Sequence, residues 1–112
     1  MTSKAYLKIL QITDMHILRT PRETLVGVDT EHYFHAVLDL AFANQETYDF
    51  VLVTGDLAQA PCKESYGRIL TILEALNIPC ACLPGNHDDF ALMQKILDTE
   101  MVNCRRQILL GN

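Results

Sequence analysis

The chain has 112 residues and 49% of them are apolar, which is enough for one domain with a hydrophobic core. A net charge of −5 without a basic stripe argues against binding to duplex nucleic acid. No apolar run reaches the roughly 18 residues of a membrane span, and no signal-peptide pattern is present, so we expect a cytoplasmic protein without a membrane segment.

The first half of the chain predicts a strand, a helix and a second strand. Residues 5–13 (AYLKILQIT) are rich in branched side chains and alternate between apolar and polar, which is typical of a strand. After an irregular segment with proline and glycine, residues 29–45 place apolar side chains at helical spacing, and Asp29 or Thr30 can serve as the N-cap. Residues 49–56 (DFVLVTGD) include a continuous apolar run, which indicates a strand covered on both faces.

The second half continues this alternation. Residues 64–77 carry apolar side chains on one helical stripe, and residues 78–86 follow as a short strand. A helix is predicted near 89–98, and residues 106–112 (RQILLGN) begin a fourth strand. Strands that alternate with helices are typical of the α/β class, so we expect a mostly parallel sheet with right-handed βαβ crossovers. Ligands of such sheets bind beyond the carboxyl ends of the strands.

The cysteines and two of the histidines are expected to have no catalytic role. The spacing of the cysteines matches neither a CxxC redox motif nor a zinc ribbon, so we interpret them as reduced thiols that act as small apolar side chains. His32 and His35 lie at the start of the first predicted helix, away from the strand ends, and are expected to face solvent. The four cysteines are Cys62, Cys80, Cys82 and Cys104.

The ends of the first two predicted strands carry residues that bind metals. Asp14 and His16 follow the first strand two positions apart, so both side chains share a face while the backbone stays extended. A carboxylate beside an imidazole is a suitable half-shell for a divalent transition metal. Gly55 lets the second strand end sharply and brings Asp56 to its tip, where one carboxylate can bridge two cations.

The third strand ends in a similar motif, Gly85-Asn86-His87-Asp88. Gly85 is expected to permit the turn, and Asn86 offers an amide oxygen as a ligand. His87 can reach toward a substrate, and Asp88 can hydrogen-bond that imidazole or cap the following helix. Each motif is common alone, but three consecutive strand ends with such residues predict a dinuclear metal site.

These motifs resemble those of the calcineurin-like metallophosphoesterases, whose pattern begins D-x-H, then G-D, then G-N-H-[D/E]. Within that family the chain is most similar to bacterial class III cyclic nucleotide phosphodiesterases of the 3′,5′-cyclic-AMP type, in the segments ITDMHI, LVGVDT, VTGDLAQ and LPGNHDD. The resemblance implies a four-layer α/β/β/α sandwich, of which residues 1–112 would be the N-terminal part. It also implies hydrolysis of a small-molecule phosphodiester or nucleotide.

The resemblance also implies roles for individual residues. Asp14 and His16 would hold a first metal, Asp56 would bridge, and Asn86 would hold the second metal and contact the substrate. His87 would bind substrate and assist the leaving group, and Asp88 would be a second catalytic residue next to it. The expected cofactors are two divalent transition metal ions, iron or manganese, with zinc as a further candidate.

Several alternatives remain open from the sequence. The family pattern continues with further histidines, whereas this chain has none after His87. It can therefore be a catalytically incomplete fragment that folds without activity and forms a homo-oligomer through an exposed half-sheet. Nucleases, phosphomonoesterases and nucleotide-diphosphate hydrolases carry similar motifs. A Rossmann-type nucleotide site is disfavoured, because the first strand–helix junction has no glycine cradle.

Overall fold

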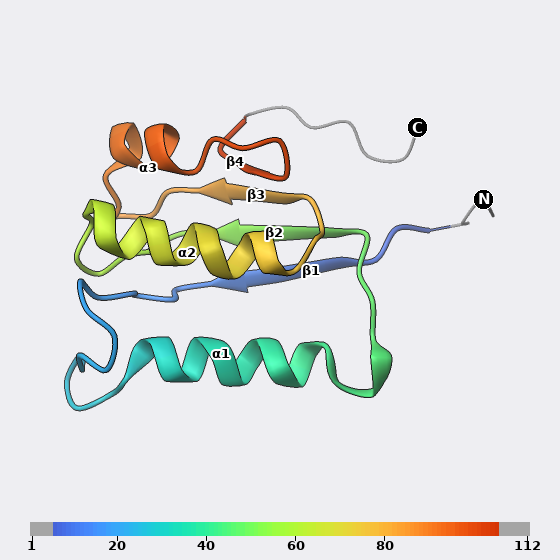
Figure 1. Cartoon of the computed structure of the whole chain (residues 1–112), viewed down its shortest axis with the longest axis horizontal. Coiled ribbons are helices and arrows are strands. Elements are labelled where there is room, and N and C mark those ends of the chain that lie inside the picture. The colour runs from blue at the N-terminus through green and yellow to red at the C-terminus, as the bar shows by residue number, and fades with distance from the viewer. Residues whose placement is uncertain (1–5, 106–112) are drawn as a thin grey trace.

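The computed structural model describes residues 6–105 and shows strands that alternate with helices (Figure 1). The elements are, in chain order, β1 (Ile9–Thr13), α1 (Thr30–Ala41), the short 3₁₀ turn η1 (Ala43–Gln45), β2 (Phe50–Thr54), α2 (Lys63–Ala75), β3 (Cys80–Leu83), α3 (Phe90–Ile96) and β4 (Val102–Asn103). Among the residues described, no helix is both long and apolar enough to cross a membrane.

The four strands form one parallel sheet in the order β1-β2-β3-β4. Thr13 pairs with Thr54, and Thr54 in turn pairs with Leu83, so the first three strands end at nearly the same level. Figure 1 shows the loops after β1, β2 and β3 together at the end of the sheet toward which the arrows point. The predicted α/β class and parallel sheet are confirmed.

The hydrophobic core lies between the sheet and its helices. Val51 and Val53, which share one face of β2, are completely buried, whereas Leu52 and Thr54 on the opposite face are partly buried, so only one face of this strand is fully covered. Ile69 and Leu73 of α2 are also fully buried, which confirms the predicted apolar stripe of this helix. Val37 is one of the apolar residues at helical spacing in the predicted helix 29–45 but is 51% exposed, so the apolar face of α1 is only partly covered.

Aspartate side chains cap the starts of α1 and α3. The Asp29 carboxylate accepts a hydrogen bond from the backbone N–H of His32, which satisfies one of the free donors at the start of α1. Asp89 does the same for Leu92 in α3. The first helix ends at Ala41 rather than at residue 45, because the backbone leaves helical geometry over the next residues and Asn44 has a positive φ of 57°.

The fourth strand differs from its prediction. The structure places β4 at Val102–Asn103, where Val102 pairs with Cys80 and Asn103 with Ala81. These two residues were not predicted as a strand, since a two-residue strand has too few positions to show a pattern. The predicted strand 106–112 lies outside the described residues.

Candidate metal centre

The loops after β1 and β2 are held side by side by backbone hydrogen bonds that continue the strand pairing. The N–H of Asp14 donates to the carbonyl of Gly55 at 3.1 Å, and the N–H of His16 donates to the carbonyl of Asp56 at 3.0 Å. On the other side, the N–H of Gly55 donates to the carbonyl of Leu83 at 2.9 Å. The candidate ligands therefore sit on backbone that is tied to the rigid sheet.

Asp14, His16 and Asp56 form a cluster that can hold a metal ion. One ligand atom from each of them lies within 4.8 Å of the other two. The Nε2 atom of His16 is 3.6 Å from a carboxylate oxygen of Asp14. Asp14 is exposed, whereas His16 and Asp56 are partly buried, so the cluster opens to solvent on one side. The structure thus brings together three of the predicted ligands.

The backbone of this cluster is left-handed, which the extended-strand interpretation did not predict. β1 ends at Thr13, and φ is 57° at Asp14, 49° at His16 and 49° at Asp56. Such values are uncommon outside glycine, although Asp, Asn and His adopt them more readily than other residues. Asp14 and His16 converge through these turns and not through the alternation of a strand. Gly55, at φ 71°, permits the sharp end of β2 as predicted.

The imidazole of His16 is oriented by a residue that sequence reasoning did not single out. Its Nδ1 lies 2.9 Å from Oε1 of Gln59, and in the tautomer with the proton on Nδ1 the ring donates to this oxygen. Nε2 is then the free nitrogen, and it faces Asp14. A metal-binding histidine usually donates its other N–H to such an acceptor, so this arrangement suits a ligand role for His16.

The loop after β3 packs directly against Asp56. The backbone N–H of His87 donates to Oδ1 of Asp56 at 2.9 Å. A Cβ atom on Gly85 would lie 2.2 Å from the Asp56 nitrogen, so glycine is required here by close approach. Gly85 also begins the turn, where its carbonyl accepts a hydrogen bond from the N–H of Asp88 at 3.2 Å, but its φ is not positive, so the close approach and not the turn requires glycine. Asn86 is exposed between Gly85 and His87, at the same edge as the cluster.

His87 is exposed, and its ring lies next to His16. The two ring centroids are 5.7 Å apart in an edge-to-face arrangement. Because the backbone of His87 is anchored on Asp56, its ring stands at the rim of the cluster, where a bound substrate would be in reach. Met15, between the two first ligands, is buried in the core.

Asp88 does not cap the helix that follows it, and this corrects one of its two expected roles. Its carboxylate accepts four hydrogen bonds. Oδ2 binds the backbone N–H groups of Leu57 at 3.0 Å and Gly85 at 2.8 Å. Oδ1 binds the N–H of Ala58 at 2.9 Å and the hydroxyl of Tyr66 at 2.8 Å. The cap is Asp89, because Asp88 is turned inward to join the loops after β2 and β3.

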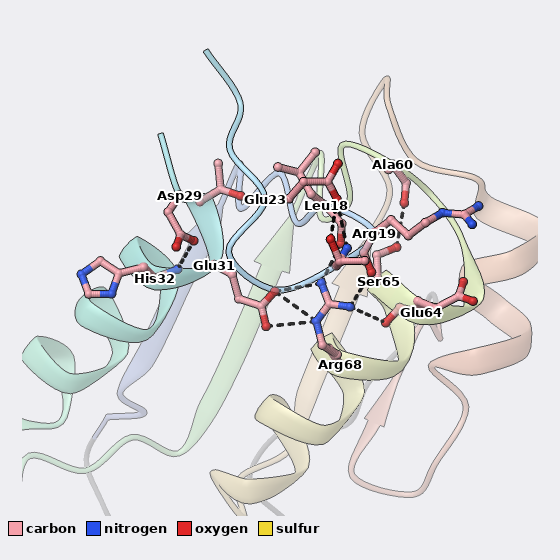
Figure 2. A network of polar contacts seen from close by, with 12 residues as sticks. Leu18, Arg19, Glu23, Asp29, Glu31, His32, Ala60, Glu64, Ser65 and Arg68 are labelled. Carbon is pink, nitrogen blue, oxygen red and sulfur yellow. Dashed lines mark hydrogen bonds and ion pairs between the residues drawn. The ribbon is translucent and has the colours of Figure 1, made fainter. Parts of the chain in front are cut away.

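The segment after His16 is held by Arg68 of α2, as Figure 2 shows. The guanidinium donates to both carboxylate oxygens of Glu31 on α1, at 2.8 to 3.1 Å. It also donates to the backbone carbonyls of Leu18 and Arg19, each at 2.7 Å. One side chain thus connects two helices to the chain that leaves the cluster, a role for which the sequence carried no signal.

The residues assigned to other roles behave as predicted. His32 and His35 are exposed on α1. The four cysteines are free thiols, and three of them are buried. Burial raises the pKa of Cys80 to about 12 and that of Cys104 to about 11, so these thiols stay protonated at neutral pH and are poor metal ligands.

The family model of calcineurin-like phosphoesterases matches residues 7–108. The chain belongs to the calcineurin-like phosphoesterase family. A phosphoesterase is a hydrolase, so the predicted enzyme class of the family is confirmed. Membership in this metallophosphoesterase family implies divalent metal ions, for which Asp14, His16 and Asp56 are suitable ligands. The parallel α/β sheet agrees with the first half of a metallophosphoesterase domain.

Curated relatives match almost all of this phosphoesterase chain. It is 32% identical over 111 residues to the 3′,5′-cyclic adenosine monophosphate phosphodiesterase CpdA of Escherichia coli (strain K12), which covers 99% of this chain and 40% of the relative. It is 35% identical over 108 residues to CpdA of Haemophilus influenzae, and this match covers 96% of this chain and 39% of the relative. A 3′,5′-cyclic-nucleotide phosphodiesterase of Nostoc sp. is 38% identical over 112 residues, and this match covers 100% of this chain and 42% of the relative. The chain spans about 40% of the length of these relatives.

Proposed function

We propose that this chain carries the first metal ligands of a phosphodiesterase that hydrolyses 3′,5′-cyclic nucleotides such as cAMP. The observation that carries the proposal is the convergence of Asp14, His16 and Asp56 at the carboxyl edge of the sheet. The substrate class comes from the relatives, which are named as phosphodiesterases of cyclic nucleotides and match nearly the whole chain.

The donor set supports two divalent transition metal ions. In the proposed arrangement Asp14 and His16 hold one ion, Asp56 bridges, and Asn86 supplies an amide oxygen to the other. Carboxylate, imidazole and amide donors without a thiolate suit iron or manganese, and zinc is a further candidate. When bound, such ions stabilise charge on the phosphoryl oxygens and make water a stronger nucleophile near neutral pH.

The remaining groups of the site supply binding and proton transfer. His87 is exposed at the rim beside His16, so its ring can donate a proton to the departing alkoxide. Asn86 can hydrogen-bond a phosphoryl oxygen. Asp88 is engaged by four donors within the protein, and we assign it to holding the loops rather than to proton transfer.

A second candidate is a catalytically incomplete chain, and two observations favour it. The chain has no histidine after His87 and spans about 40% of its relatives, whereas the family pattern contains further histidine ligands. We propose that residues 1–112 form the N-terminal part of one metallophosphoesterase domain and that another segment or a second copy supplies those ligands. β1 lies at one edge of the sheet, and its Ile9 is 47% exposed, which makes this edge a candidate for such an association. The cytoplasmic location stays a prediction.

The experiment that tests the proposal is metal loading combined with hydrolysis. The chain is loaded with Mn²⁺, its metal content and oligomeric mass are measured, and hydrolysis of cAMP is compared with that of bis(p-nitrophenyl) phosphate. Binding of two ions with preference for cAMP would support the phosphodiesterase. One ion without hydrolysis would support the incomplete chain. Absence of any bound ion would refute a metal centre built by this chain alone and would also support the incomplete chain.

Asp56→Asn is the decisive variant. It removes the bridging charge but keeps Oδ1, which accepts the hydrogen bond from the N–H of His87, so the loops can stay in place. We expect loss of Mn²⁺ binding and of metal-dependent hydrolysis in any active form. Asp39→Asn removes the same charge from an exposed position on α1 and serves as the control. Full activity in Asp56→Asn would rule out the bridging role.

A further inference from the structure

The loops after β2 and β3 both carry proposed ligands, and a hydroxyl from the interior joins them. Tyr66 lies in α2 with its side chain completely buried. Its hydroxyl donates to Oδ1 of Asp88 at 2.8 Å and accepts from the backbone N–H of Asp89 at 3.0 Å. In the sequence Tyr66 is only one member of the apolar stripe of its helix, so its pattern predicts packing and nothing more.

The contact with Asp88 reaches the loop that carries Asp56. Besides the tyrosine hydroxyl, the Asp88 carboxylate holds the N–H groups of Leu57 and Ala58, which directly follow Asp56, and that of Gly85, which precedes Asn86. The Asp88 carboxylate therefore adds two hydrogen bonds between the loops, at Leu57 and Ala58, to the one that the N–H of His87 donates to Asp56. Three of its four donors belong to the backbone, and the fourth is the side chain of Tyr66.

We propose that the hydroxyl of Tyr66 is a positioning group of the metal centre. It keeps the Asp88 carboxylate seated between the two loops and thereby fixes Asp56 relative to Asn86 and His87. This inference rests on the proposed metal-dependent function and adds a residue outside the family's ligand motifs. Tyr66 itself touches neither metal nor substrate, because its ring is buried behind the loops.

The chemistry of the phenol suits this role. Burial raises the pKa of Tyr66 well above its ordinary value of 10.0, so the hydroxyl keeps the proton that it donates to Asp88. Removal of the hydroxyl leaves Oδ1 of Asp88 with one donor and takes away the acceptor of the N–H of Asp89. The aromatic ring, and with it most of the packing, is retained in Tyr66→Phe.

Tyr48→Phe is the matched control. The hydroxyl of Tyr48 also donates a hydrogen bond within the protein, to the carbonyl of Ala41 at 2.8 Å, but this contact lies at the C-terminal end of α1. Both variants lose one hydroxyl from a tyrosine, and only one of these hydroxyls contacts the proposed metal centre. A general loss of stability can therefore be separated from a change in the site.

Two measurements on the full chain test the proposal. In the metal-free chain, hydrogen exchange is followed at the amides of Leu57, Ala58 and Gly85, and Mn²⁺ affinity is then measured by electron paramagnetic resonance. For Tyr66→Phe we expect about tenfold faster exchange at these amides and about tenfold weaker Mn²⁺ binding, the usual size of an effect on groups that support metal ligands. For Tyr48→Phe we expect neither change.

The possible failures can be told apart. If the wild-type chain binds Mn²⁺ and Tyr66→Phe binds it equally well, the positioning role is overturned and the proposed metal centre stands. The positioning role is also overturned if Tyr48→Phe weakens Mn²⁺ binding as much as Tyr66→Phe does, because the weaker binding then results from a general loss of stability. If the wild-type chain binds no Mn²⁺, a metal centre built by this chain alone is refuted, and with it the positioning role of Tyr66 in that centre.

Discussion

Substitution of Gly85 tests how tightly the two ligand loops are packed. In Gly85→Ala the new Cβ would lie 2.2 Å from the backbone nitrogen of Asp56, 2.4 Å from its Oδ1 and 2.8 Å from the carbonyl carbon of Gly55. Two of these three atoms belong to the backbone, so rotation of a side chain cannot relieve the contact. The loops must move apart, and the hydrogen bond from His87 to Asp56 must lengthen.

The expected loss of stability is at the upper end of that for overpacking, about 3 kcal/mol. An unfolding entropy of about 2 cal/mol/K per residue corresponds to roughly 0.2 kcal/mol/K for a chain of this size. Gly85→Ala should therefore lower Tm by more than about 10 °C. Mn²⁺ binding should weaken as well, because Asp56 is displaced from Asp14 and His16.

Gly67→Ala is the matched substitution, and its expected change in stability has the opposite sign. Gly67 lies inside α2, and a Cβ there would meet no atom within 4 Å. Alanine is favoured over glycine in a helix by up to about 1 kcal/mol, so this variant should be more stable than wild type. Urea unfolding followed by circular dichroism measures both variants. Equal stability of Gly85→Ala and wild type, with unchanged Mn²⁺ affinity, would refute the reasoning.

Two further predictions concern the interior. Arg68→Met should lower the free energy of unfolding by about 2 to 4 kcal/mol, because Glu31 and two carbonyl groups lose their charged donor. A double-mutant cycle with Glu31→Gln should show coupling, and strict additivity would contradict the contact. The raised pKa values of Cys80 and Cys104 should make the chain less stable above about pH 8.5, because the unfolded state loses thiol protons there that the folded state keeps. The free energy of unfolding should fall by up to about 1.4 kcal/mol per pH unit for each thiol. Urea unfolding under reducing conditions at pH 7.5 and 9.5 measures this, and equal stability at both would argue against burial of these thiols.

The candidate ligands were predictable from the sequence because their positions depend on short-range features. Asp14, His16 and Asp56 each follow an apolar run, and parallel strands place such ends at one edge of a sheet. The mutual distance of these side chains was predicted for the wrong reason, since it depends on left-handed backbone that no period of apolar residues reveals.

The supporting groups were not predictable in this way. Gln59 binds His16 across 43 sequence positions, and Tyr66 binds Asp88 across 22. Such contacts depend on how α2 packs against the sheet, which a single sequence does not specify residue by residue. For Tyr66 the apolar stripe was correct but incomplete, because a phenol also satisfies buried polar groups.

The left-handed backbone at Asp14, His16 and Asp56 has a consequence for the interpretation of related sequences. Aspartate, asparagine and histidine are the side chains that tolerate this conformation best after glycine, and they are also the donors that a divalent metal requires. Backbone geometry and metal chemistry therefore favour the same residues at these positions. A relative that had lost its metal could keep them for conformational reasons alone, whereas a β-branched residue there would indicate that the loop itself has changed.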